Sequence, residues 1–256
     1  MLTVQQVYEL INARAPFETQ VTYDNSGLLV GDPCREVTGI HLALDVTAYV
    51  IDEAIAKGAN LIVTHHPLMF SPIKSLTETD VQSRLLCRLV RAGISLISAH
   101  TNLDQAQGGV NDTLCSALGL IHVTGEGFVR VGDLPSPMAA NALAAHIRQA
   151  LGDVVRVTGA SEQVITRVGV CSGSGSDEWP SAAAMGAQAF ITGEAKHHHA
   201  LEAAQCGVVM LEAGHYATEA PGIFALADAL QNEEVIVQYK VRVSTSHALT
   251  HQSTVR

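Results

Sequence analysis

Strand-like and helix-like runs alternate along this chain, and that alternation restricts its fold more than any other feature. Short runs rich in Val, Ile and Leu predict strands at 37–45, 60–66, 94–100, 164–176, 187–195, 207–215 and 235–243. Helical spacing between them predicts helices at 50–58, 81–93, 110–119 and 223–230, with a His-rich helix near 197. Such alternation is typical of mostly parallel sheets covered by helices on both faces. We therefore expect an α/β protein.

Two pairs of segments resemble each other across the two ends of the chain. KGANLIVTHHP (57–67) resembles MGAQAFITGEAKHH (185–198), and AGISLISAHTNLD (92–104) resembles CGVVMLEAGHYATE (206–219). Both members of the second pair end in a histidine followed four residues later by a carboxylate. We infer two pseudo-equivalent α/β lobes, 1–125 and 126–256. Because ligands bind at the carboxyl ends of parallel strands, we expect a metal site in the cleft between the lobes.

Composition and charge exclude several classes of protein. The formal net charge is −10, and Lys and Arg form no cluster, so we expect no direct nucleic-acid binding. The five cysteines are scattered without a C-x-x-C spacing, which indicates neither a disulfide framework nor a zinc knuckle and fits a reducing cytoplasm. No apolar stretch is long enough to span a membrane, and no leader precedes the first helical run. We expect a cytoplasmic protein with a polar, loose tail at 244–256.

Ligand-type side chains lie at or just after the ends of the predicted strands. They are His65, His66, His100, Asp104, His215 and Glu219. Imidazole and carboxylate ligands suit Zn, Mn, Fe or Co. Six ligands exceed the need of one ion, whereas two ions about 3.5–4 Å apart with a bridging carboxylate would use them all. Adjacent side chains on a strand point to opposite faces, but Pro67 ends the strand, so His65 and His66 can bind different ions.

Alternative explanations apply to other parts of the pattern. A single buried histidine commonly serves only as a structural hydrogen-bonding group, although four strand ends with such residues favour a metal site over coincidence. Successive residues of a helix are 100° apart, so at most one of His197, His198 and His199 reaches the site. The segment CSGSGSDEW (171–179) is either an anion-binding loop or a tight strand-to-helix turn. It matches neither a P-loop nor a G-x-S-x-G nucleophile elbow.

Four blocks of sequence together carry a family resemblance. They are YDNSGLLVGDP (23–33), VTHHPLMF (63–70), SAHTNLDQAQGGVND (98–112), and FITGEAKHH with LEAGHYATE (190–198 and 211–219). In these blocks the chain resembles the Nif-three-like family of dinuclear-metal, ring-forming proteins, the GTP cyclohydrolase I type 2 homologues. The matched length implies the compact form of the family, without the inserted PII-like domain.

The resemblance also implies roles for individual residues. It implies that the metal ligands are His65, His66, Asp104, His215 and Glu219, with Glu219 as the bridge. His100 matches a histidine close to the ions, and His198 matches the histidine that closes a "TGD" block, in which this chain has Glu194 in place of Asp. Asp24, Asn25 and Gly27 match a block that is structural or lines the cleft.

The implied activity is metal-dependent hydrolysis of a small molecule, specifically of a nucleotide. Two divalent ions would lower the pKa of a bridging water, and the resulting hydroxide would open the guanine ring at C8 and release formate. His100 or His198 would carry the proton. The resemblance further implies a toroidal homohexamer, a trimer of dimers. Two alternatives stay open, namely another dinuclear hydrolase that acts on a phosphoester or heterocycle, and a non-enzymatic protein that handles or delivers metal.

Overall fold

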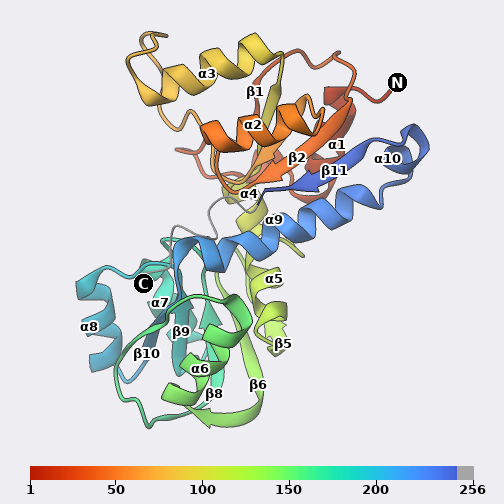
Figure 1. The fold of residues 1–256 in the computed structure, drawn as a ribbon. Coiled ribbons are helices and arrows are strands. Elements are labelled where there is room, and N and C mark those ends of the chain that lie inside the picture. Colours follow the sequence, from red (N-terminus) through yellow and green to blue (C-terminus); the bar gives the residue numbers. More distant parts are fainter. Residues whose placement is uncertain (247–256) are drawn as a thin grey trace. The chain divides into compact units, whose positions relative to one another are not determined.

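The chain forms two compact units, each built on its own sheet (Figure 1). The computed structural model describes residues 1–246. Unit 1 comprises Met1–Ala106 and the segment that starts at Ile223, and unit 2 comprises Gln107–Gly222. The predicted lobes, 1–125 and 126–256, differ from these units in two ways, because unit 2 already begins at Gln107 and the chain returns to unit 1 after Gly222. The α/β class is confirmed. Most of the predicted tail, 244–256, lies outside the described residues.

Unit 1 contains a mostly parallel sheet of five strands in the order β1-β4-β3-β2-β11. The strands are β1 (Gly27–Val30), β2 (Gly39–Ala43), β3 (Leu61–Thr64), β4 (Ser95–Ser98) and β11 (Arg242–Thr245). Only β1 runs antiparallel to its neighbour. In the central pair, Leu61 lies opposite Ser95 and Thr64 lies opposite Ser98. Strands β3 and β4 therefore end at the same level, which aligns the residues that follow them.

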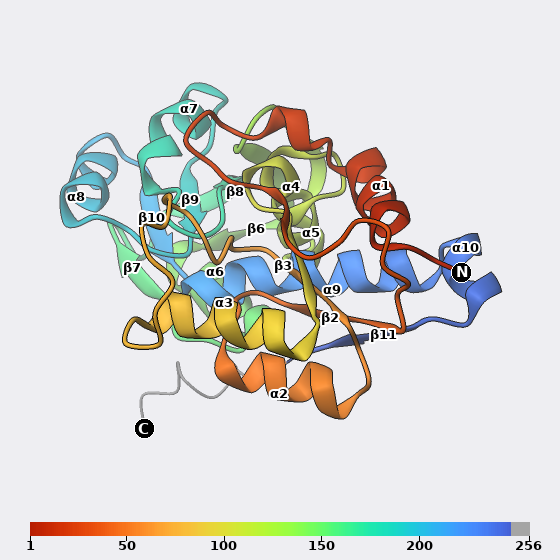
Figure 2. The ribbon, with the colours of Figure 1, turned by 90° about the horizontal axis from the view of Figure 1, so that it is seen from above.

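Helices cover this sheet on both faces. Unit 1 contains α1 (Val4–Arg14), a 3₁₀ turn at Phe17–Thr19, α2 (Ala48–Ala56), α3 (Val81–Ala92), α4 (Thr101–Gln105) and α10 (Glu234–Tyr239), and α9 (His215–Gln231) enters it at Ile223. Ile62 of β3 and Leu96 of β4 lie on one face of the sheet and belong to the same core as Ile51 of α2 and Leu89 of α3. The part of α9 in unit 1 lies on the opposite face (Figure 2). Both faces of the strands are therefore mostly apolar, as is typical of a covered parallel sheet.

Unit 2 contains a mixed sheet of six strands in the order β5-β6-β8-β9-β10-β7. They are β5 (Ile121–Thr124), β6 (Arg130–Ala139), β7 (Arg156–Thr158), β8 (Val164–Val170), β9 (Ala189–Thr192) and β10 (Val209–Glu212). Strands β8, β9 and β10 are parallel, and the other pairs are antiparallel. The antiparallel strands come from the irregular middle of the sequence, so this sheet is less parallel than that of unit 1.

The helices of unit 2 pack on two separate apolar cores. They are α5 (Val110–Ala117), α6 (Ala140–Leu151), α7 (Trp179–Ala184) and α8 (His197–Gln205), with a 3₁₀ turn at Ser176–Glu178. Ile191 and Leu211 belong to the core that includes α5 and α6. Their sequence neighbours, Phe190 and Met210, belong to the core that includes α7 and α8. The alternation places successive strand residues on opposite faces.

One predicted strand is wrong over half of its length. The run VIVQYKVRV at 235–243 forms helix α10 (Glu234–Tyr239) before β11 begins at Arg242. Ile236 is buried, and Lys240 ends the helix with a φ of 56°. A short apolar run has no period that separates a helical turn from a strand. Among residues 1–246, no helix is both long and apolar enough to cross a membrane.

Candidate metal centre

The ends of β3 and β4 bring three histidines together in unit 1. The backbone N–H of Ala99 donates to the carbonyl of Thr64 at 2.9 Å, so the pairing continues beyond both strands. The Thr64 hydroxyl donates to the carbonyl of His66 at 2.9 Å, which bends the chain just after β3. His65 and His66 therefore leave their strand beside His100, which leaves β4 at the same level.

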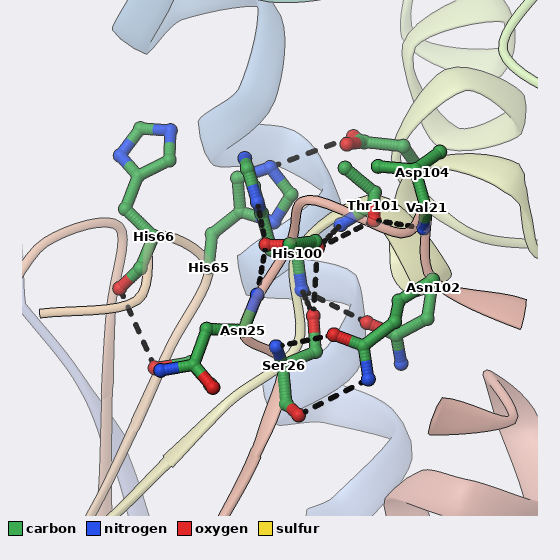
Figure 3. A network of polar contacts seen from close by, with 12 residues as sticks. Val21, Asn25, Ser26, His65, His66, His100, Thr101, Asn102 and Asp104 are labelled. Carbon is green, nitrogen blue, oxygen red and sulfur yellow. Dashed lines mark hydrogen bonds and ion pairs between the residues drawn. The ribbon is translucent and has the colours of Figure 1, made fainter. Parts of the chain in front are cut away.

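The three imidazoles form a compact cluster (Figure 3). The ring centroid of His65 lies 5.0 Å from that of His66 and 5.0 Å from that of His100, and the centroids of His66 and His100 are 5.5 Å apart. One ring nitrogen from each histidine lies within 4.8 Å of the other two. His65 is fully buried, and the other two side chains are partly exposed. The bend after Thr64 thus overcomes the strand alternation that would separate His65 from His66.

An oxygen atom lies next to Nδ1 of each imidazole. The partner of His65 is the Ala99 carbonyl at 2.9 Å, that of His66 is Asp45 Oδ1 at 2.8 Å, and that of His100 is Asp24 Oδ1 at 2.8 Å. When neutral, each ring donates from Nδ1 to this oxygen and carries its lone pair on Nε2. Histidines that bind metal through Nε2 have this arrangement of outer hydrogen bonds.

Asp104 adds a carboxylate to the imidazole cluster. It lies in α4, whose first turn begins directly after His100, and it is only 8% exposed. Its Oδ1 atom lies 3.4 Å from Nε2 of His65 (Figure 3). A carboxylate and an imidazole nitrogen that face each other at this distance are suited to bind the same divalent ion. The donors are nitrogen and oxygen with no thiolate, so the residues present fit Zn, Mn, Fe or Co.

Asp24 fixes His100 from a segment near the amino terminus. Its carboxylate also accepts from the backbone N–H of Thr101 at 3.1 Å and from the hydroxyl of the same residue. Burial opposes ionisation of Asp24, but the hydrogen bonds from His100 and Thr101 outweigh it and hold its pKa well below the usual range. The family resemblance implies that the block containing Asp24 is structural or lines the cleft. The contacts show that Asp24 has a structural role, since it orients His100.

The sequence did not single out Asp45, which orients His66. Asp45 follows β2, and Ala43 of this strand lies opposite Thr64 of β3. The signal was available, because a carboxylate directly after a neighbouring parallel strand falls at the same edge of the sheet. It was hidden because Asp45 has no counterpart in the internal repeat.

Unit 2 brings a second pair of predicted residues together. His215 begins α9, directly after β10, and Glu219 follows one turn later on the same face. Nε2 of His215 lies 3.0 Å from Oε2 of Glu219, and its Nδ1 lies 3.4 Å from Glu194 Oε1. Glu219 is only 5% exposed. The predicted residues thus fall into two groups, four in unit 1 and this pair in unit 2.

The glycine-rich segment after β8 packs against this pair. Gly173 has a φ of +58°, and a Cβ atom there would lie 2.1 Å from Oε1 of Glu219. Its N–H donates to the Thr218 hydroxyl at 3.1 Å, and its carbonyl accepts from the N–H of Glu194 at 2.8 Å. The segment is therefore a tight strand-to-helix turn whose backbone forms a wall beside His215 and Glu219.

The histidine triple lies in the first turn of α8. His198 is exposed, and its ring contacts that of His199 at a centroid distance of 4.3 Å. His199 is only partly exposed, and its Nδ1 lies 3.0 Å from the Ser176 hydroxyl. This contact with Ser176 joins the His199 side chain to the turn that precedes α7. The assignment of proton transfer to His198 remains a prediction.

Comparisons with known proteins agree on one family. Residues 2–251 match the model of the family described as Duf34/NIF3 (NGG1p interacting factor 3). A protein of Clostridium perfringens named GTP cyclohydrolase 1 type 2 homolog is 34% identical over 240 residues, which cover 90% of this chain and 92% of the relative. A protein of the same name from Clostridium acetobutylicum is 31% identical over 241 residues, 90% of each chain. The crystal structure of Staphylococcus aureus protein SA1388 is 29% identical, with a TM-score of 0.94 and coverage of 100% and 99%.

Proposed function

Because the chain belongs to the DUF34/NIF3 family, we propose that it binds two divalent metal ions and hydrolyses a small nucleotide. The residues that would hold the ions are His65, His66 and Asp104 from unit 1 and His215 and Glu219 from unit 2. The observation that carries this proposal is the orientation of His65 and His66, where an oxygen next to each Nδ1 leaves Nε2 as the coordinating atom.

Bound divalent ions would polarise the substrate and make water acidic enough to provide a nucleophile near neutral pH. The chain's own residues supply proton transfer and orientation. His100 lies within the imidazole cluster, and Asp24 holds its Nδ1, so Nε2 is the atom that accepts and returns a proton. His198 is the second proposed proton carrier. The ring-opening reaction is proposed because many relatives are named after GTP cyclohydrolase.

The test combines metal analysis with an assay for formate. Protein purified without added metal should contain about two ions per chain, and this number should fall in His66→Ala and Glu219→Ala. Metal-loaded protein should release formate from GTP, and His100→Ala should slow the release by roughly 10²–10⁴-fold while it retains metal. Formate release that is equal in wild type and His66→Ala would contradict the proposal. Retained metal without hydrolysis of any nucleotide would instead indicate the alternative, a protein that handles metal.

We also propose that the protein assembles as a homohexamer, a trimer of dimers. The support is the resemblance to a family of ring-forming proteins. Native mass spectrometry of the metal-loaded protein should give six times the 27.0 kDa chain mass. A monomer or an isolated dimer at micromolar concentration would contradict this assembly.

A further inference from the structure

Two exposed aromatic rings lie beside the imidazole cluster of unit 1. Tyr23 directly precedes Asp24, the residue that orients His100, and Phe70 lies in the segment that follows His66. Their exposed fractions are 67% for Tyr23 and 46% for Phe70. Single exposed apolar residues are common on protein surfaces and have no special meaning. Two large rings that touch each other next to a candidate metal site are a different case.

The rings form a continuous series that ends at the candidate site. The centroids of Tyr23 and Phe70 are 6.3 Å apart, with their planes tilted by 53°. The Phe70 ring in turn lies 6.1 Å from the ring of His100 in an edge-to-face arrangement. These separations are within the range at which aromatic rings attract each other. A flat molecule that stacks on this pair would therefore be held one ring away from His100.

The two segments that carry the rings are tied together. The side-chain amide of Asn25 donates to the carbonyl of Met69 at 2.6 Å, which joins the residue after Asp24 to the residue before Phe70. The backbone N–H of Asp24 closes a turn by donating to the carbonyl of Val21 at 2.9 Å. A surface whose backbone is already fixed loses less conformational entropy when a ligand binds.

We propose that Tyr23 and Phe70 form a stacking surface for the heterocyclic ring of a nucleotide. This inference rests on the proposed function, because the ring must lie close to the metal ions for hydrolysis. The aromatic faces bind any flat base through stacking, since every base has a π-face. The phosphate groups would go to the ions, because the chain as a whole is acidic, with a net charge of −10. Tyr23 and Phe70 would thus determine that the substrate carries a flat ring.

The test measures the binding of GTP and of inorganic triphosphate to the metal-loaded protein by calorimetry. Tyr23→Leu and Phe70→Leu remove the π-face and keep apolar bulk, so each should weaken GTP binding by roughly 5- to 150-fold. Tyr23→Phe keeps the ring and should bind GTP like wild type. Tyr49→Leu is the matched control, because Tyr49 is an aromatic residue of α2 that is 60% exposed. Triphosphate binding and metal content should stay unchanged in all four variants.

Several results would overturn the stacking surface. Equal losses for GTP and triphosphate, or a lower metal content in the leucine variants, would mean that the rings act through the metal site. Wild type that holds its ions but binds GTP no more tightly than triphosphate would also overturn it and leave the metal site intact. Wild type without ions would count against the proposed function. The surface would then be judged by the binding of guanosine to metal-free protein, and equal binding by wild type and Tyr23→Leu would overturn it.

Discussion

Contacts with individual oxygen atoms fix the orientation of each imidazole ring in unit 1. Two of the three outer contacts come from carboxylates, Asp45 and Asp24, and the third comes from a backbone carbonyl. The sequence predicted His65, His66 and Asp104 because ligand-type residues at the ends of parallel strands share one edge of a sheet. It could not reveal which oxygen holds each ring, because these contacts depend on side-chain directions that no spacing encodes.

Asp45→Asn should weaken metal binding without unfolding the protein. The substitution removes the negative charge beside Nδ1 of His66, and loss of such an outer partner typically costs 10- to 100-fold in metal affinity. Competition with a chelating dye measures the affinity, and thermal melting of metal-free protein checks the fold. Asp228→Asn, at an exposed position of α9, provides the control. Unchanged affinity in Asp45→Asn would show that this carboxylate does not support a ligand.

His41 should make unit 1 less stable at acidic pH. Its side chain is fully buried in β2, with Nδ1 2.9 Å from the Ser244 hydroxyl, and burial together with the nearby Lys57 lowers its pKa below the usual value of about 6.5, although Glu53 acts in the opposite direction. Below that value the unfolded chain binds the proton and the folded chain resists it. The free energy of unfolding should therefore fall as the pH falls below about 6.5.

Urea titrations of metal-free protein between pH 5 and pH 8 measure this effect. The difference between wild type and His41→Gln isolates His41 from the other histidines, because Gln does not titrate. The two proteins should converge as the pH falls. A difference that is constant across this pH range would show that His41 does not titrate differently in the folded and unfolded states.

Strand ends and tight turns position the candidate ligands at the scale of elements. In both units, two adjacent parallel strands, β3 with β4 and β9 with β10, end at one level and are followed by ligand-type residues. The sequence repeat predicted this correctly, because strand ends leave a strong pattern of apolar residues followed by polar ones. Helix α10 was missed because Val and Ile favour strands in isolation, and a run this short has no period that identifies a helix.

Gly173→Ala should displace Glu219 as well as strain the turn after β8. A methyl group there would overlap the Glu219 carboxylate, in addition to the cost of a left-handed backbone, which is about 1–2 kcal/mol for a residue with a side chain. Gly119→Ala is the matched control, because Gly119 has a φ of +70° with no atom within 4 Å of the added methyl. Denaturant unfolding should show a larger loss of stability at Gly173.

Metal content separates the two glycine variants further. Gly173→Ala should lose bound metal, whereas Gly119→Ala should keep it, because only the first contacts a proposed ligand. Equal effects of the two substitutions on both stability and metal content would mean that the close approach to Glu219 is unimportant.

At the scale of the whole molecule, the segment that forms unit 2 lies in the sequence between the two segments that form unit 1. Within residues 1–246, unit 2 is a single segment, Gln107–Gly222, whereas unit 1 needs the segment from Ile223 to complete its sheet with β11. The pairing of Arg242 with Gly39 joins residues that are about 200 positions apart in the sequence. Local sequence patterns do not indicate which distant strands pair, so the unit boundaries could not be predicted from them.

A fragment of residues 107–222 should fold alone, whereas a fragment of residues 1–106 should not. The first contains all six strands of its sheet and both of its cores, but the second lacks β11 and leaves one side of β2 unpaired. Dispersed amide resonances and a cooperative melt would identify the folded fragment. A cooperative melt of 1–106, without the later segment, would contradict this dependence.

The late return of β11 has a consequence for synthesis on the ribosome. The edge of β2 stays open while all of unit 2 is being made, since its partner strand is translated only afterwards. Unit 2 can complete its folding first, and unit 1 meanwhile exposes an unpaired strand of the kind that recruits other chains into aggregates. We therefore expect chains that end before Arg242 to aggregate more readily than chains that include β11.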